Sequence, residues 1–363
     1  MKILIISGSF YPIIAPRSFR TTELVKELSR KGNNVTLYIP KDGIDRDDLE
    51  KEYGFSIQYY ERPKDKLINS KSKLVYFIER CMVHGFAYPD ISILRTLKSS
   101  LKNEKNDYDL LITIAAPHAI HWTIGKMYKS GRRLAKTWVA DCGDPYMLGG
   151  TLSVQHPFYF KYIEKLWCRE CNYIAVPTEG AINGYYPEFK DKIRVISQAF
   201  NFEEIERVQY VKNEVPTFVY SGSIWNGSKD PKPFLDFLTQ IPQDFRFYVY
   251  TKDVHVLDSY KEIFKEKLIV SPFIPRLELI KKLSSMDFLV HFEFHTSVQT
   301  PSKLIDYSLS GRPILAVNVK RIETDKDMIM QFLSGDYSKQ YIVKDMSRYD
   351  IHNVAQQFMD LTK

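Results

Sequence analysis

Short, continuous apolar runs recur along both halves of the chain. A run without alternating polar positions is typical of a strand that is buried on both faces of a parallel sheet. In the first half we therefore expect strands at 2–6, 35–39, 110–115, 137–140, 174–176 and 193–196. In the second half we expect strands at 218–220, 246–250, 268–270, 288–291 and 314–317.

Helical patterns separate these runs. In the first half a helix is expected from Ser18 to Lys31, and it completes a strand–helix–strand unit. In the second half helices are expected near 231–240, 255–267, 276–285 and 301–310. This alternation predicts an α/β protein with two Rossmann-like, doubly wound domains. The expected parts are a domain at 1–197, a polar linker at 198–215, a domain at 216–345, and a C-terminal helix within 346–363 that returns to the first domain. Residues 41–105 have only weak periodicity.

The stretch TPSKLIDYSLSGRPILAV, residues 300–317, carries the most specific chemistry. Thr300 suits a helix N-cap. Lys303 is unusual because the helix dipole disfavours a cation in the first turn. An anion held between the helix amides, the Ser302 hydroxyl and the Lys303 ammonium would resolve that conflict, and Asp306 could then accept hydrogen bonds from a ribose. A surface pair between Lys303 and Asp306 explains the same residues without a ligand.

These residues resemble the nucleotide-sugar-binding motif of family-4-type retaining glycosyltransferases of the bacterial surface-polysaccharide type. In that family, P-S-K-L-x-E-Y precedes a small-residue turn and an apolar strand. The resemblance implies the GT-B fold, with two domains facing across a cleft. It also implies that Ser302 and Lys303 meet the donor pyrophosphate and that Asp306 meets the ribose. The family's first glutamate falls on Val298 here, so its acidic role is absent or has moved to Glu293.

The same resemblance implies further donor contacts in the second half. Ser223 stands where the family usually has an arginine, so Lys229 is expected to carry the remaining pyrophosphate contact. Lys232 is a substitute for that role. Phe273 and Ile274 belong to the segment that is expected to hold the base through backbone groups.

The first loop contains Gly8 but lacks the G-x-G-x-x-G fingerprint, which argues against NAD or FAD. Arg17 and Arg20 lie near the start of the next helix. The resemblance places this loop under the donor phosphates and beside the acceptor, with Arg17 the stronger candidate for a catalytic role. Solvation of a helix start is the alternative explanation for both arginines.

His118 and His121 follow a predicted strand at its carboxyl end, where ligands bind in open α/β sheets. A single histidine on a helix is usually structural. The related glycosyltransferases carry a Pro-His element here, close to the transferred sugar, and this favours His118 over His121 as the functional residue.

Asp141 opens the segment DCGDPY at the end of another predicted strand. Relatives commonly show a D-x-R-D-P-W element here, and in this chain Gly143 replaces the arginine and Tyr146 the tryptophan. Asp141 could orient an acceptor hydroxyl, or it could cap the segment that follows.

Charge is distributed unevenly along the chain. Lys and Arg outnumber Asp and Glu by 30 to 22 over residues 1–195, against 21 to 22 over the remainder. A basic first half favours an anionic contact, and simple solubility is the alternative. Because no nucleic-acid-binding signature is present, we expect a membrane surface rather than nucleic acid. We see no signal peptide and no run long enough to span a membrane. The expected location is therefore cytoplasmic, or peripheral on the inner face of the membrane.

Two patterns that could bind metal have simpler explanations. Cys168 and Cys171 lie in a helical pattern without a second pair, so we expect two helix residues rather than a metal or redox site. The Asp-x-Asp triplets at 45–47 and 325–327 precede helical stretches, where capping explains them. No metal or cofactor is expected, since a nucleotide-sugar would be a substrate.

The function expected from these observations is transfer of a sugar from a nucleotide-sugar to a lipid-linked or saccharide acceptor, in surface polysaccharide synthesis. Likeness to the family implies retention at the anomeric carbon, with Lys229, Lys303 and helix amides stabilising the departing phosphate. Two alternatives remain open. One is a nucleotide-sugar 2-epimerase on the same fold, and the other is a non-catalytic scaffold of the same fold.

Overall fold

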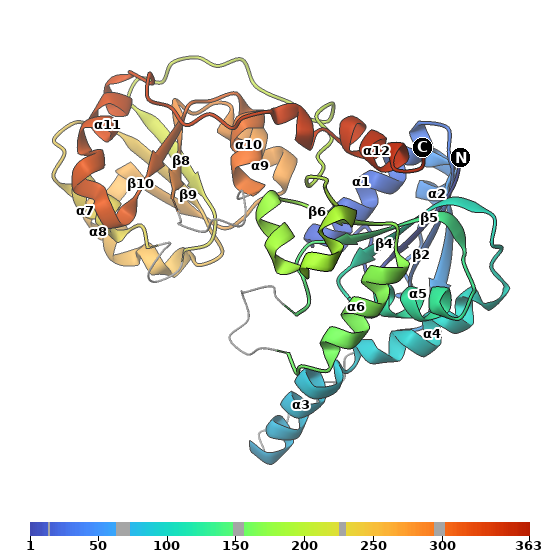
Figure 1. The fold of residues 1–363 in the computed structure, drawn as a ribbon. Coiled ribbons are helices and arrows are strands. Elements are labelled where there is room, and N and C mark those ends of the chain that lie inside the picture. Colours follow the sequence, from blue (N-terminus) through green and yellow to red (C-terminus); the bar gives the residue numbers. More distant parts are fainter. Residues whose placement is uncertain (14, 63–72, 148–155, 225–229, 294–301) are drawn as a thin grey trace. The chain divides into compact units, whose positions relative to one another are not determined.

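The computed structural model describes residues 1–13, 15–62, 73–147, 156–224, 230–293 and 302–363. The chain divides into two compact units. Unit 1 comprises Met1–Phe200 with Arg348–Lys363, and unit 2 comprises Asn201–Ser347. Each unit contains one parallel sheet with helices around it (Figure 1). The fold class expected from the sequence, two Rossmann-like α/β domains, is confirmed.

The sheet of unit 1 has the strand order β3-β2-β1-β4-β5-β6-β7, and its neighbouring strands are parallel. Side chains of β1 alternate between two cores. Leu4 and Ile6 join the core on one face, and Ile3 and Ile5 join the core on the other. The strands are β1 (Lys2–Ser7), β2 (Asn34–Pro40), β3 (Ser56–Tyr60), β4 (Tyr108–Ala115), β5 (Ala135–Cys142), β6 (Tyr173–Val176) and β7 (Ile193–Val195).

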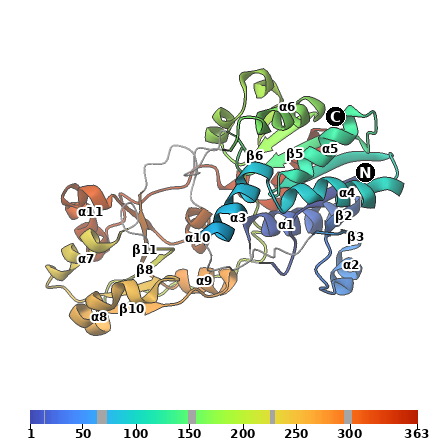
Figure 2. The ribbon, with the colours of Figure 1, turned by 90° about the horizontal axis from the view of Figure 1, so that it is seen from below.

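Helices cover both faces of this sheet. Buried residues of α4, α5 and α6 share one core with Trp138 of β5, and residues of α1 and α12 share the other core. The last helix of the chain therefore packs in unit 1, through side chains such as Phe358. Figure 1 shows α12 beside α1, and Figure 2 shows the C-terminus within unit 1. The helices are α1 (Pro16–Arg30), α2 (Asp47–Tyr53), α3 (Lys73–Phe86), α4 (Ile93–Ser100), α5 (Ala119–Lys129), α6 (Phe160–Glu170) and α12 (Ile351–Asp360).

Unit 2 repeats the design with the strand order β10-β9-β8-β11-β12. Its strands are β8 (Thr217–Ser221), β9 (Arg246–Tyr250), β10 (Leu268–Ser271), β11 (Phe288–Phe292) and β12 (Ile314–Val317). Its helices are α7 (Lys232–Thr239), α8 (Asp258–Phe264), α9 (Arg276–Leu283), α10 (Ser302–Ser310) and α11 (Ile322–Ser334). Gly311 follows α10 with φ +75°, the left-handed conformation that ends a helix most easily at glycine.

The structure adds elements that the sequence pattern did not predict. Strand β3 lies at the edge of its sheet and buries only Ile57 and Tyr60, so it lacks a continuous apolar run. Helices α2, α3 and α4 also fall within 41–105. Helix α1 begins at Pro16 rather than at Ser18, because proline suits the first helical positions.

Candidate functional site

Unit 2 has a topological switch point between β8 and β11. The chain passes from β8 outward to β10 and then returns to β11 on the other side of β8. Open α/β sheets bind ligands beyond the carboxyl ends of their strands at such a point. Helix α10 follows β11 here and begins at Ser302, so its first amides open at this edge of the sheet.

Lys303 lies in the first turn of α10, beside an aromatic ring. Its Nζ is 4.4 Å from the centroid of the Tyr220 ring. Tyr220 belongs to β8 and is almost fully buried, and its hydroxyl donates to the Ser223 carbonyl at 2.9 Å. The ring therefore places an ammonium group near the end of β8, at the helix terminus that favours anions.

Tyr307 joins α10 to the end of β8. Its hydroxyl accepts a hydrogen bond from the Ser221 backbone N–H at 2.8 Å, and both groups are buried. Tyr307 belongs to the motif identified in the sequence, but no role was assigned to it there. Its position in the motif is the signal that could have identified it, because a buried tyrosine hydroxyl needs a hydrogen-bond partner.

Asp306 is paired with an arginine that the sequence analysis did not single out. Its Oδ1 accepts from Arg276 Nε at 2.8 Å and lies 2.7 Å from Arg276 Nη2. Burial raises the pKa of Asp306, and the Arg276 guanidinium opposes that rise. The predicted contact of Asp306 with a ribose stays a prediction. The alternative surface pair does not account for the contact with Arg276.

The other expected donor residues of unit 2 lie at different places. Ser223 is half-buried beyond β8. Phe273 is 41% exposed, and Ile274 packs against a core cluster. Glu293 is exposed directly after β11. Lys232 begins α7. The calls on Lys229, Thr300 and Val298 lie outside the described residues, and for Ser302 only its place as the first residue of α10 is described.

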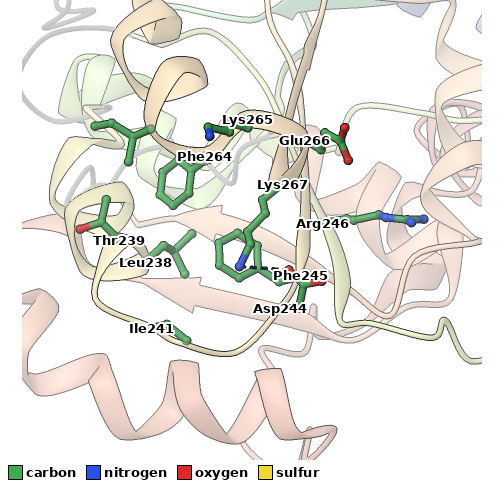
Figure 3. A pocket seen from close by; sticks show the side chains of 11 residues that line it. Leu238, Thr239, Ile241, Asp244, Phe245, Arg246, Phe264, Lys265, Glu266 and Lys267 are labelled. Carbon is green, nitrogen blue, oxygen red and sulfur yellow. Dashed lines mark ion pairs between the residues drawn. The ribbon is translucent and has the colours of Figure 1, made fainter.

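Unit 2 also has a hollow that is unrelated to these residues. It lies at the amino ends of β9 and β10, between the end of α7 and the residues after α8 (Figure 3). Lys267 forms an ion pair with Asp244 there at 3.0 Å, and its Nζ lies 5.4 Å from the centroid of the Phe245 ring. Because ligands of such sheets bind at the carboxyl ends, this hollow is not the candidate donor site.

Unit 1 has its own switch point between β1 and β4. The loops that follow these two strands approach closely at Gly8. A Cβ at Gly8 would lie 2.1 Å from Pro117 Cδ and 2.8 Å from the Ala116 carbonyl oxygen. Only glycine leaves room for this approach, so the structure assigns Gly8 a packing role at the edge where a ligand would bind.

Arg17 fills the space beside Gly143. A Cβ at Gly143 would lie 1.5 Å from Arg17 Nη2 and 2.3 Å from its Cζ. Arg17 Nη1 is also 3.6 Å from Asp141 Oδ2. The guanidinium therefore lies where a side chain at position 143 would otherwise begin.

Arg20 and Asp141 form a buried, two-pronged ion pair. Arg20 Nε donates to Asp141 Oδ2 at 2.6 Å, and Nη2 donates to Oδ1 at 2.8 Å. Arg20 also donates to the carbonyls of Ser197 at 2.6 Å and Ile196 at 3.2 Å. Asp141 is fully buried and its carboxylate contacts arginine side chains, while its predicted contact with an acceptor hydroxyl stays a prediction. Solvation of the helix start does not explain Arg20, which is also buried.

The two histidines have different surroundings. His121 is fully buried, with Nδ1 2.8 Å from the Thr113 hydroxyl and its ring 4.8 Å from that of Trp167. His118 is only partly buried at the start of α5, with Nδ1 3.8 Å from Cys142 Sγ. Burial is the main cause that lowers the pKa of each to about 3, so both imidazoles are neutral near pH 7. His118 is the better placed of the two to meet a ligand.

Glu164 is a buried carboxyl group that the sequence analysis did not identify. It accepts hydrogen bonds from the backbone N–H groups of Tyr146 at 3.1 Å and Met147 at 3.4 Å, and from the Tyr186 hydroxyl at 3.1 Å. Burial raises the pKa of Glu164 to about 7. Glu164 thus holds the DCGDPY segment by its backbone. Its place on α6 gave no signal, because its spacing resembles that of an ordinary polar helix residue.

The cysteine pair and the two Asp-x-Asp triplets make contacts within the protein. Cys168 and Cys171 lie in the core of unit 1 as free thiols. Asp45 Oδ1 accepts from the Asp47 N–H at 2.9 Å, and Asp325 Oδ2 accepts from the Asn318 N–H at 2.8 Å. In the described part of the chain, no cluster of three His, Cys, Asp or Glu side chains is arranged to hold a metal ion. No described helix has the length and hydropathy to cross a bilayer.

No protein-family model matches the chain, and no curated protein matches it. Solved structures resemble it in fold. A glycosyltransferase from Rickettsia africae is 11% identical, with a TM-score of 0.62, and the match covers 100% of this chain and 98% of that one. TarM from S. aureus gives 9% identity, a TM-score of 0.62 and the same coverage. Anabaena Alr3699/HepE, solved with UDP and glucose, gives 12% identity, a TM-score of 0.55 and coverage of 99% and 98%. The chain has the GT-B glycosyltransferase fold.

Proposed function

We propose that this chain transfers a sugar from a nucleotide-sugar donor to a lipid-linked or saccharide acceptor, with retention at the anomeric carbon and without a metal. The observation that carries the proposal is the position of Lys303 in the first turn of α10, beside Tyr220 and beyond the end of β8. A diphosphate would find an ammonium group and helix amides there. The fold shared with solved glycosyltransferases supports this choice of ligand.

In this proposal the donor diphosphate binds to unit 2. Lys303 and the first amides of α10 stabilise the negative charge that develops as the sugar leaves. Lys229 remains the expected second cation. The ribose hydroxyls would bind to the carboxylate of Asp306, which Arg276 keeps oriented through its two short contacts. Phe273 and Ile274 would lie beside the base.

Unit 1 would supply the groups that bind the acceptor. Arg17 would supply the positive charge of this part of the site. Its guanidinium lies beside Asp141 and occupies the space next to Gly143. Asp141 is therefore a positioning residue in this proposal rather than a base. His118 is neutral near pH 7 and would donate or accept a hydrogen bond with a sugar hydroxyl. Synthesis of a surface polysaccharide at the inner face of a membrane fits this class of acceptor.

Calorimetric titration with UDP, GDP, ADP and CMP tests the donor site. We expect one nucleotide to bind, and we expect Lys303→Ala to weaken that binding by about tenfold to a hundredfold, the range for loss of a charge-assisted hydrogen bond. Lys339→Ala is the matched control, because Lys339 is an exposed lysine of the same unit. If Lys303→Ala and Lys339→Ala bind equally well, the phosphate role of Lys303 is wrong.

The two alternatives make different predictions in the same assays. A scaffold would bind none of the nucleotides, and the departures from the family pattern at Ser223, Gly143 and Val298 are what favours it. A 2-epimerase would isomerise the donor in the absence of any acceptor. A glycosyltransferase releases its nucleotide at a rate that depends on the acceptor, so measuring nucleotide release against acceptor concentration separates the three functions.

A further inference from the structure

The guanidinium of Arg17 carries a positive charge that donates no hydrogen bond within the described chain. Its closest carboxylate oxygen there, Asp141 Oδ2, is 3.6 Å away. Asp141 already accepts short hydrogen bonds from Arg20, at 2.6 Å and 2.8 Å. Two guanidinium groups therefore share one carboxylate, and one positive charge is left over. The side chain of Arg17 is 21% exposed, so this charge lies mostly out of water, where an anion is its favoured partner.

The amino end of α5 lies beside Arg17. His118, the N-cap residue of α5, has Nδ1 3.8 Å from Cys142 Sγ. The next residue in sequence is Gly143, and a Cβ there would lie 1.5 Å from Arg17 Nη2. No side chain of the described chain caps this helix end, and the first turn contains no acidic residue. The positive end of the helix dipole is therefore added to the charge of Arg17.

His121 adds a buried N–H donor at the same helix end. Trp138 Nε1 can only donate, so the Thr113 hydroxyl accepts from it at 2.8 Å and gives its own proton to His121 Nδ1, also at 2.8 Å. The proton of the neutral His121 ring then lies on Nε2, which is buried and has no hydrogen-bond partner among the described residues. Nε2 faces the Asp141 backbone without reaching hydrogen-bond geometry.

The first backbone amides of α5 are in the same condition. The N–H groups of Ala119 and His121 have no acceptor in the part of the chain that the structure describes, and both residues are buried. Buried donors are normally paired. Together with the free Nε2 of His121, they point to a ligand that accepts hydrogen bonds and carries negative charge.

We propose that unit 1 binds a phosphate group of the acceptor here, between Arg17 and the amino end of α5. A guanidinium presents parallel N–H groups that match two phosphate oxygens, and a helix N-terminus favours the remaining negative charge. Arg17 is partly exposed and makes the direct contact, while the buried donors add positive potential. This inference rests on the proposed function, in which Lys303 of unit 2 serves the donor diphosphate. It narrows the acceptor to one that carries a phosphate ester.

Calorimetric titration of the full chain with inorganic phosphate at low ionic strength tests the site. Lys303→Ala serves as the background, so that the expected phosphate ligand of unit 2 does not contribute. Arg17→Gln in this background should lower phosphate affinity by about tenfold or more, the loss expected for a charge-assisted hydrogen bond. Arg95→Gln is the matched control, because Arg95 is exposed on α4 of the same unit, and it should bind phosphate like the background chain. Equal affinities for the Arg17→Gln and Arg95→Gln chains overturn the proposal.

Gly143→Ala keeps every charge and moves only the guanidinium. The new Cβ would overlap Arg17 Nη2, the far end of a flexible side chain, so Arg17 shifts at little cost to the fold. Phosphate affinity should fall, while the unfolding free energy stays near that of the background chain. Affinity that survives Gly143→Ala would show that net charge, rather than a built site, attracts phosphate, and the proposal would be wrong.

Two phosphate esters identify the source of the phosphate. Tighter binding of farnesyl phosphate than of glucose 1-phosphate assigns the site to a lipid-linked acceptor, and the reverse order assigns it to a saccharide acceptor. Both orders support the proposal if Arg17→Gln weakens the tighter ester. A nucleoside diphosphate that displaces inorganic phosphate from the Lys303→Ala chain more strongly than either ester would place the donor here and overturn the acceptor assignment.

Failure of this inference is distinguishable from failure of the proposed function. If nucleotide binding responds to Lys303→Ala but phosphate binding does not respond to Arg17→Gln, only the phosphate site of unit 1 is wrong. If phosphate binds through Arg17 but no nucleotide binds to the unmodified chain, the anion site stands and the proposed sugar transfer fails.

Discussion

The two units place cations at the ends of their sheets by different means. In unit 1, Arg20 is buried with a fully buried carboxylate, and Arg17 is held by the same Asp141. In unit 2, Lys303 lies against the face of the Tyr220 ring. A carboxylate neutralises the guanidinium that it binds, whereas the ring attracts an ammonium group and leaves its net charge unchanged.

The cations of the two units therefore have different roles. The Arg20–Asp141 pair links α1, β5 and the carbonyls after β7, so it fixes the framework of unit 1. Of the two arginines, only Arg17 retains partial exposure, with 21% of its side chain accessible. The contact of Lys303 with Tyr220 orients its ammonium group near the end of β8. Breaking the Arg20–Asp141 pair should therefore lower the stability of unit 1. Breaking the contact between Lys303 and Tyr220 should lower the ligand affinity of unit 2.

The largest effect is expected for Asp141→Asn. The substitution leaves the Arg20 guanidinium buried without an opposite charge, which costs about 3–5 kcal/mol of unfolding free energy. Denaturant unfolding, followed by signals from each unit, measures the loss. Asp107→Asn is the control, since Asp107 pairs with Lys2 on the surface, and it should change stability little. An equally small loss for Asp141→Asn would show that the buried pair does not fix the framework.

Glu164 offers a third arrangement, a buried carboxyl group whose hydrogen bonds with described residues come from two backbone N–H groups and a tyrosine hydroxyl. Its pKa is about 7 in the folded protein against an ordinary value of 4.5. At this group the folded state therefore binds more protons than the unfolded state between these values, so the contribution of Glu164 to the unfolding free energy should fall as pH rises from about 4.5 to 7, by on the order of 3 kcal/mol. The lowered pKa values of His118 and His121 act in the opposite direction over most of this window, so the Glu164 contribution is measured as a difference between variants.

Glu164→Gln should gain unfolding free energy relative to the unmodified chain as pH rises from 4.5 to 7, because the amide does not titrate. The control is Glu188→Gln on the same unit, whose carboxylate is exposed and pairs with Lys165. Its pH profile over this window should run parallel to that of the unmodified chain. A Glu164→Gln profile that is also parallel to that of the unmodified chain would contradict the assignment.

Much of the fold could be predicted because buried parallel strands have a simple pattern. Runs such as 3–6 and 218–220 are apolar without alternation, and both are buried in strands at the middle of their sheets. Strand β3 was not predicted because it lies at the edge of its sheet and buries only Ile57 and Tyr60. Helix α3 was not predicted because many of its apolar side chains are exposed. Its sequence therefore lacks the single apolar stripe that marks a helix packed against a core.

The site was predicted less completely, for a physical reason. Local chemistry and the family resemblance together selected Lys303 and Asp306 from the motif at 300–317, and their contacts with a donor stay predictions. Arg20 and Asp141 are 121 positions apart in sequence, and Arg276 and Asp306 are 30 apart, so their pairing depends on the fold. No pattern along the chain shows that the guanidinium of Arg17 fills the space over Gly143. Such contacts become visible only when strand ends are brought to one edge of a sheet.

The smallest effect is expected at the ring beneath Lys303. Tyr220→Leu removes the aromatic face, and a cation–π contact is worth about 0.5–2 kcal/mol, so nucleotide affinity should fall by about twofold to thirtyfold. Tyr220→Phe keeps the ring and loses only the hydroxyl contact with Ser223, and it should bind nucleotide nearly as well as the unmodified chain. Calorimetry on both variants separates the ring from the hydroxyl. Equal losses in the two variants would mean that the hydroxyl-held loop after β8, rather than the ring, positions the ammonium group, and the contrast between the units would then rest on a hydrogen bond.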